Sequence, residues 1–94
     1  MRSLEFDPAA FEDLAWWVGH ERAKAPRIIK LIREVQREPF EGTGQPERLK
    51  HELEGSWSRR IDREHRLVYQ VFKDKVRILA CRTTTDIRFL CLQV

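Results

Sequence analysis

The chain has few of the residues that mark metal, redox or membrane chemistry. Its two cysteines, Cys81 and Cys91, form no Cys-x-x-Cys motif, and its three histidines are scattered. We therefore expect no metal site and no cofactor, and we expect Cys81 to be an inert strand residue. No apolar run approaches a membrane span, and the first residues lack the apolar core of a signal peptide. These absences predict a cytoplasmic protein.

Glycine is also scarce, and the four glycines form no phosphate-binding motif. Gly42 and Gly44 lie too close together for one, and no Lys-Ser or Lys-Thr pair follows them. They belong instead to a loop from Phe40 to Pro46. We expect this loop to turn the chain so that Glu47 reaches the sheet.

Charge is plentiful but nearly balanced. The 94 residues carry a net charge of +3, and 41% of them are hydrophobic, which is typical of one small globular domain. Residues 2–38 have equal numbers of basic and acidic side chains, so the surplus lies in residues 39–94. This is only a weak sign of a polyanionic partner, so any RNA affinity must come from local clusters of cations.

The apolar pattern predicts an α+β domain. A short strand at residues 3–6 precedes a helix that starts at Asp7 and Pro8, and a second helix begins near Pro26 and stops before Pro39. Three strands follow, at residues 57–62, 67–72 and 76–82. The order β-α-α-β-β-β predicts two helices packed on one face of a largely antiparallel four-stranded sheet.

The same periodicities predict the core. Trp16 and Trp17 cannot both face it, and a half-buried position at its edge is expected for one of them. The side chains expected to be mostly buried are Phe11, Leu14, Val18, Ile28, Leu31, Ile32, Val35, Leu67, Tyr69, Val71, Ile78 and Ala80.

One stretch combines a carboxylate with many cations. Glu47 follows the glycine loop, and the next twenty residues supply Lys50, His51, Arg59, Arg60, Arg63, His65 and Arg66. A carboxylate can take a proton from a ribose hydroxyl, and arginines can hold a phosphate as its charge grows. The alternative is a solvated surface with ion pairs, which composition alone would favour.

The amino-acid sequence of this stretch resembles that of the YoeB toxins of the RelE-like ribonuclease superfamily. The similar strings are Pro-Phe-Glu-Gly-Thr-Gly-Gln-Pro-Glu at 39–47, Leu-Lys-His at 49–51, Trp-Ser-Arg-Arg-Ile at 57–61 and Glu-His-Arg-Leu-Val-Tyr at 64–69. The resemblance runs from about residue 1 to Arg82. It implies the fold that the periodicity predicts.

The resemblance also implies a reaction, which is cleavage of messenger RNA in the ribosomal decoding site by 2′-hydroxyl attack, without a metal. It implies that Glu47 is the general base and that Arg66 stabilises the phosphate. Lys50 and Arg60 would contact the RNA backbone. Arg59 should lie on the opposite face from Arg60, because neighbours alternate across a strand.

The resemblance fails at the C-terminus. The family ends in Arg-Tyr-His-Tyr, whereas Thr84 stands here in place of the histidine acid and Thr85 in place of the last tyrosine. A threonine hydroxyl does not exchange protons near pH 7. His51 is a possible substitute, while His65 should point to the other face. We expect a toxin domain at 1–85 and an extension at 86–94 that a one-nucleotide deletion in the Tyr-His-Tyr codons would produce.

Two functions follow from these observations. The first is a ribosome-dependent endoribonuclease toxin whose activity is impaired. The second is a toxin-fold protein that binds an antitoxin, and the ribosome, without cleaving RNA. The resemblance suggests a homodimer and a YefM-like antitoxin. The charged face of the second helix, which includes Arg27, Lys30, Arg33 and Arg37, is expected to be solvated, with ribosomal RNA as the alternative contact.

Overall fold

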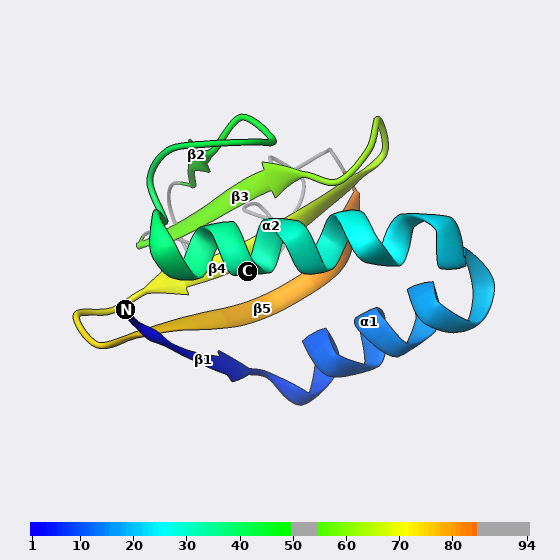
Figure 1. The fold of residues 1–94 in the computed structure, drawn as a ribbon, viewed down its shortest axis with the longest axis horizontal. Coiled ribbons are helices and arrows are strands. Elements are labelled where there is room, and N and C mark those ends of the chain that lie inside the picture. The colour runs from blue at the N-terminus through cyan, green and yellow to red at the C-terminus, as the bar shows by residue number, and fades with distance from the viewer. Residues whose placement is uncertain (50–54, 85–94) are drawn as a thin grey trace.

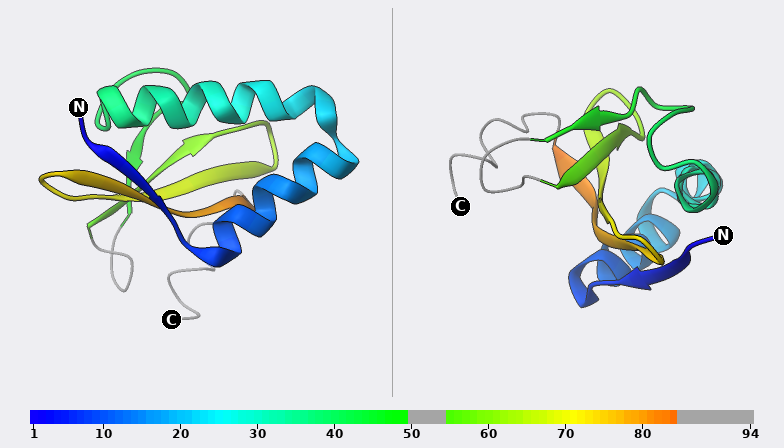
Figure 2. Two further views of the ribbon diagram at one scale, coloured as in Figure 1. Left: turned by 60° about the horizontal axis from the view of Figure 1, so that its bottom comes forward. Right: turned by 90° about the vertical axis from the view of Figure 1, so that its left-hand side faces the viewer.

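The structure, a computed structural model, describes residues 1–49 and 55–84. The elements are β1 (Ser3–Phe6), α1 (Pro8–His20), the short 3₁₀ turn η1 (Arg22–Lys24), α2 (Ala25–Arg37), β2 (Glu47–Arg48), β3 (Ser56–Arg60), β4 (His65–Val71) and β5 (Lys75–Thr84). They form one sheet with the strand order β1-β5-β4-β3-β2, and Figure 2 shows both helices on the same side of it. The predicted α+β class is confirmed.

The strand number differs from the prediction. The sheet has five strands, because Glu47 and Arg48 pair with Ser58 and Trp57 as a two-residue strand. Such a short strand carries no readable alternation, so the sequence did not reveal it. The pairings are antiparallel except that β1 lies parallel to β5 at one edge (Figure 1).

Helix α1 starts where the sequence predicts, but it buries a different face. Phe11 and Val18 are 60% and 50% exposed, so the prediction that they belong to the core is wrong. The buried face consists of Ala10 and Trp17, with Leu14 packed against it. The reason is Trp17, whose large indole is fully buried and donates a hydrogen bond from Nε1 to the carbonyl of Cys81 at 2.7 Å.

Helix α2 follows its predicted stripe. Ile28, Leu31, Ile32 and Val35 are buried, and the charged residues lie opposite them. Pro26 lies in the first turn, where its missing N–H costs nothing. In the described ranges, neither helix is both long and apolar enough to cross a membrane.

The sheet contributes the other half of the core. Leu67, Tyr69 and Ile78 are buried as predicted, whereas Val71 and Ala80 are only partly so. Cys81 is buried as well, and burial raises the pKa of its thiol to about 12. Trp16 stays half-buried at the edge of the core, beside Trp17, as expected.

Candidate active site

The site is built on the face of the sheet that looks away from the helices. In the strand register Glu47 lies opposite Ser58, and Arg60 lies opposite Arg66. Alternate residues of a strand share a face, so Ser58 and Arg60 point to the same side of β3. The two strands and β2 therefore bring a carboxylate, a hydroxyl and two guanidinium groups to one surface.

Arg66 is the centre of this group. Its Nη1 donates to Glu47 Oε2 at 3.1 Å and to Ser58 Oγ at 2.8 Å. The Arg66 side chain is only 7% exposed, whereas that of Glu47 is 61% exposed. The arrangement is a buried cation that holds an accessible carboxylate in place.

Several donors on this face remain unused. Ser56 Oγ, Arg60 Nε and Arg66 Nε are buried and have no hydrogen-bond partner in the described part of the chain. Buried polar groups without partners are uncommon, and each needs an explanation. Arg60 and Arg66 lie opposite each other in the register, whereas Ser56 lies opposite Gln70. An anion such as a phosphate would supply acceptors for the two arginines.

The carboxylates close in sequence to Arg66 are used elsewhere. Asp62 accepts hydrogen bonds from Lys24 and from the amides of Glu64 and His65. Burial alone would raise the pKa of Asp62, but these hydrogen bonds outweigh it and hold the pKa well below its usual range. Among the described residues, the carboxylate that pairs with Arg66 is therefore Glu47, and not its sequence neighbours Asp62 and Glu64.

His65 lies on the opposite face from Arg66, as predicted. Its ring packs edge-on against Trp17 of α1 with centroids 4.9 Å apart, and its Nδ1 lies 3.1 Å from Asp62 Oδ1. These contacts tie the β3–β4 turn to the helices. The ring is thus on the core side of the sheet.

Arg59 is also on the helix side, and it is fully buried. Its guanidinium donates to Glu34 Oε1 at 3.0 Å, to Tyr69 Oη at 3.2 Å and to three backbone carbonyls of the loop that leads to Glu47. Those carbonyls belong to Glu38, Glu41 and Thr43, at 2.6, 2.6 and 3.3 Å. Arg59 therefore positions the loop. Sequence reasoning placed it on the correct face but did not reveal this task.

The loop is bent by left-handed residues. Gly42 and Gly44 have φ of 123° and 87°, and Gln45 has φ of 52°, which is uncommon for a residue with a side chain. The carbonyl of Gly44 accepts a hydrogen bond from the Arg60 amide at 2.7 Å. This contact docks the loop on β3 three residues before Glu47.

Some predicted site residues cannot be placed. Lys50, His51 and Thr85 lie outside the described residues, and only the backbone of Thr84 is described. That backbone pairs with His65, and Thr83 lies opposite Arg66. Across residues 1–49 and 55–84, no group of three or more histidine, cysteine, aspartate or glutamate side chains could hold a metal ion.

Ser58 was not singled out from the sequence as a site residue. The signal that could have found it is its position two residues before Arg60, on the same face of one strand.

Comparisons with known proteins identify the family to which the chain belongs. Residues 6–84 match the sequence model of the YoeB-like toxin of bacterial type II toxin–antitoxin systems. The chain is 55% identical over 82 residues to the toxin RelK of Mycobacterium tuberculosis, an alignment that covers 87% of this chain and 96% of RelK.

Solved structures resemble it as well. A YoeB–YefM complex from Staphylococcus aureus matches with a TM-score of 0.78 and 37% identity, covering 87% of this chain and 95% of that one. A YoeB dimer from the same organism matches with a TM-score of 0.79 and 38% identity, covering 86% and 94%. The chain belongs to the YoeB-like toxin family of bacterial type II toxin–antitoxin systems.

Proposed function

We propose that this chain derives from an endoribonuclease that cleaves messenger RNA on the ribosome, and that its cleavage is impaired. The single observation that carries the proposal is the Arg66 cluster. A buried guanidinium holds the exposed Glu47 carboxylate at 3.1 Å, next to donors that have no acceptor in the part of the chain that the structure describes. This is the arrangement that phosphodiester chemistry needs.

In the proposed reaction, Glu47 takes the proton of a ribose 2′-hydroxyl. The 2′-oxygen then attacks the adjacent phosphorus, and the bond from phosphorus to the 5′-oxygen breaks. Arg66 stabilises the extra negative charge on the phosphate in the transition state, and Arg60, Lys50 and His51 bind the RNA. The nucleophile is part of the substrate, so the proposed reaction uses no metal.

The resting ion pair fits this order of events. Arg66 is held between Ser58 and Glu47, and its Nε has no partner among residues 1–49 and 55–84. A phosphate can therefore bind through unused donors without first displacing Glu47. The carboxylate is exposed enough to reach a ribose.

The step that we expect to be slowed is protonation of the leaving 5′-oxygen. Strand β5 ends beside the site, since Thr83 lies opposite Arg66 in the register. The resemblance places the family's acid one residue later, at Thr84, where this chain has a hydroxyl that cannot donate a proton near pH 7. Loss of a general acid typically costs about a hundredfold to ten-thousandfold in rate.

The alternative is a binding protein that does not cleave RNA. This alternative is favoured by Thr84 and Thr85, which stand where the resemblance places a histidine and a tyrosine. In both cases we propose a YefM-like antitoxin as partner, because a similar toxin was solved in complex with YefM. A homodimer is proposed from the dimer of a similar toxin. The ribosome with its messenger RNA is proposed as the target from the resemblance of the sequence alone.

The test is a cleavage assay on translating ribosomes with three forms of the chain. We expect the 94-residue chain to cleave slowly or not at all. A restored form, with Tyr, His and Tyr at 83–85 followed by a stop, should cleave at least a hundredfold faster. Glu47→Gln in the restored form should remove that gain.

Each outcome separates the possibilities. Rapid cleavage by the unaltered chain would refute the claim of impairment. Inactivity of the restored form, with antitoxin binding intact, would favour the binding protein. Unchanged cleavage after Glu47→Gln would exclude Glu47 as the base.

A further inference from the structure

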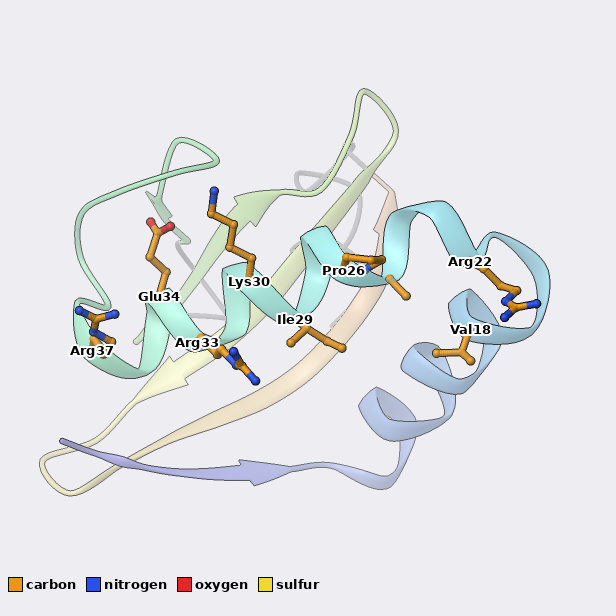
Figure 3. Close-up of a pocket in the computed structure, with 9 residues that line it drawn as sticks. Val18, Arg22, Pro26, Ile29, Lys30, Arg33, Glu34 and Arg37 are labelled. Carbon is orange, nitrogen blue, oxygen red and sulfur yellow. The ribbon is translucent and has the colours of Figure 1, made fainter.

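The outer face of the helices carries a groove that the proposed reaction does not use. It has a volume of about 620 Å³ and runs along α2 from the end of α1 (Figure 3). Its floor is apolar and comes from Val18, Ala25, Pro26 and Ile29. Val18 is 50% exposed, and Ile29 is also exposed. Both side chains therefore offer apolar surface to the same groove.

Cations surround this floor. Arg22, Lys30, Arg33 and Arg37 line the groove, and none of them forms a salt bridge with any of the described residues. Figure 3 shows Lys30, Arg33 and Arg37 along α2 on one side of Ile29, and Arg22, in η1, on the other side. The groove is therefore apolar in the middle and positive along its rim.

Glu34, the one carboxylate among the described residues that line the groove, does not compensate these charges. Glu34 accepts hydrogen bonds from the amide of Thr43 at 2.6 Å and from buried Arg59 at 3.0 Å. The hydrogen bond from Thr43 is the main reason that the pKa of Glu34 is lowered, and the positive charge of Arg59 adds to it. Its negative charge is directed to the loop side of α2.

Two occupants fit the groove poorly. A second copy of this chain would bring the same four cations against each other in a twofold interface, where like charges repel. A nucleic acid would satisfy the cations, but its phosphates would leave Val18 and Ile29 without an apolar partner. Nucleic-acid interfaces are more polar than this floor.

We propose that the groove binds an acidic amphipathic segment of another protein. Apolar side chains of that segment would pack on Val18, Ala25 and Ile29, and its carboxylates would pair with the cations of the rim. Helix α2 has 13 residues, about 20 Å at 1.5 Å per residue, which suits a partner helix of three to four turns.

This surface is independent of the Glu47–Arg66 site. The groove lies on the helix side of the molecule, and the Arg66 cluster lies on the opposite face of the sheet. A partner in the groove would leave the RNA-facing surface free. The inference thus stands whether or not the chain cleaves RNA.

The experiment is titration of the ¹⁵N-labelled full chain with synthetic peptides, followed by amide chemical shifts. The main probe is a 15-residue helical peptide with leucines along one face and glutamates beside them. One control peptide has lysines in place of the glutamates, a second has serines in place of the leucines, and a third titration uses oligouridylate RNA.

We expect the acidic amphipathic peptide to shift amides of the groove between residues 18 and 37. Arg33→Glu and Ile29→Asp, both at exposed positions, should each weaken its binding at least tenfold, about 1.4 kcal/mol. Arg63→Glu serves as the matched control, because it reverses an exposed charge outside the groove. It should leave the affinity within about twofold.

The proposal fails if the acidic peptide produces no shifts in the groove at millimolar concentration. It also fails if its affinity falls equally with Arg63→Glu, because the attraction would then be nonspecific. Shifts of the groove amides with RNA, lost in Arg33→Glu, would assign the groove to nucleic acid instead. Equal binding of the serine peptide would show that the apolar floor plays no part.

Discussion

Replacing Arg59 with methionine should be among the most destabilising single changes in this chain. The buried guanidinium connects α2, β4 and the loop before Glu47 through five hydrogen bonds, two of them at 2.6 Å. Methionine fills a similar volume but donates nothing. It leaves Glu34 without its cation and three loop carbonyls without their donor.

The size of the effect follows from the partners that are left behind. Breaking a buried ion pair by removing one member typically costs about 3–5 kcal/mol. The side chain of Glu34 is 28% exposed and can regain some water, so we expect the lower part of this range, about 3 kcal/mol. In a domain of this size that corresponds to a decrease in Tm of about 12–24 °C.

Urea denaturation followed by circular dichroism would measure the change in the free energy of unfolding. Tyr69→Phe is the matched control. It removes only the hydroxyl that bonds the carbonyl of Pro39 and the Nε of Arg59, so it should cost about 1–2 kcal/mol. Arg59→Lys should recover little, because an ammonium group cannot reproduce the planar fork. A cost below about 1 kcal/mol for Arg59→Met would refute the reasoning.

Three further predictions concern stability. The pKa of Asp62 is lowered in the folded chain, so its contribution to the free energy of unfolding is present above the unfolded pKa of about 3.9 and is lost as the pH falls. The free energy of unfolding should therefore be smaller at pH 2 than at pH 5. Asp62→Asn should make this difference smaller. Gly42→Ala should destabilise by about 1–3 kcal/mol, because the new Cβ would clash with Glu34 Oε1 at a φ of 123°. Gly19→Ala should stabilise by about 0.5–1 kcal/mol, because the new Cβ would have no described atom within 4 Å; thermal melts of both variants would test the contrast. Arg66→Met should cost about 1 kcal/mol or less, because it removes two hydrogen bonds within the described residues and exposed Glu47 regains water. A urea-derived loss above about 3 kcal/mol would contradict this.

The two helices show where periodicity is enough to predict a buried face. In α2, apolar and charged residues separate cleanly, and the predicted stripe is buried. In α1 most residues are apolar or small, so more than one face matched the pattern. Trp17 determines which face is buried, because burying its indole with the N–H hydrogen-bonded stabilises the fold more than burying Phe11 or Val18.

The site shows a similar division. Alternation along β3 correctly separated Arg59 from Arg60, since it depends only on the geometry of one strand. The contact of Glu47 with Arg66 depends on the register of a two-residue strand, which no local pattern specifies. The resemblance pointed to both residues, but only the structure gives the distance of 3.1 Å between Arg66 Nη1 and Glu47 Oε2.

The two buried arginines explain how neighbouring strands serve different purposes. The Arg59 guanidinium donates hydrogen bonds to five acceptors, so its N–H groups are all paired and it holds the loop in place. Within the described residues, Arg66 has two acceptors and a buried Nε with none, so hydrogen-bonding capacity remains for a ligand. A guanidinium that stabilises a fold gains most when every N–H is paired, whereas one that binds a phosphate must keep donors free until the phosphate arrives. If this reasoning holds, replacing Arg59 changes chiefly stability and replacing Arg66 changes chiefly phosphate binding, although both side chains are almost equally buried.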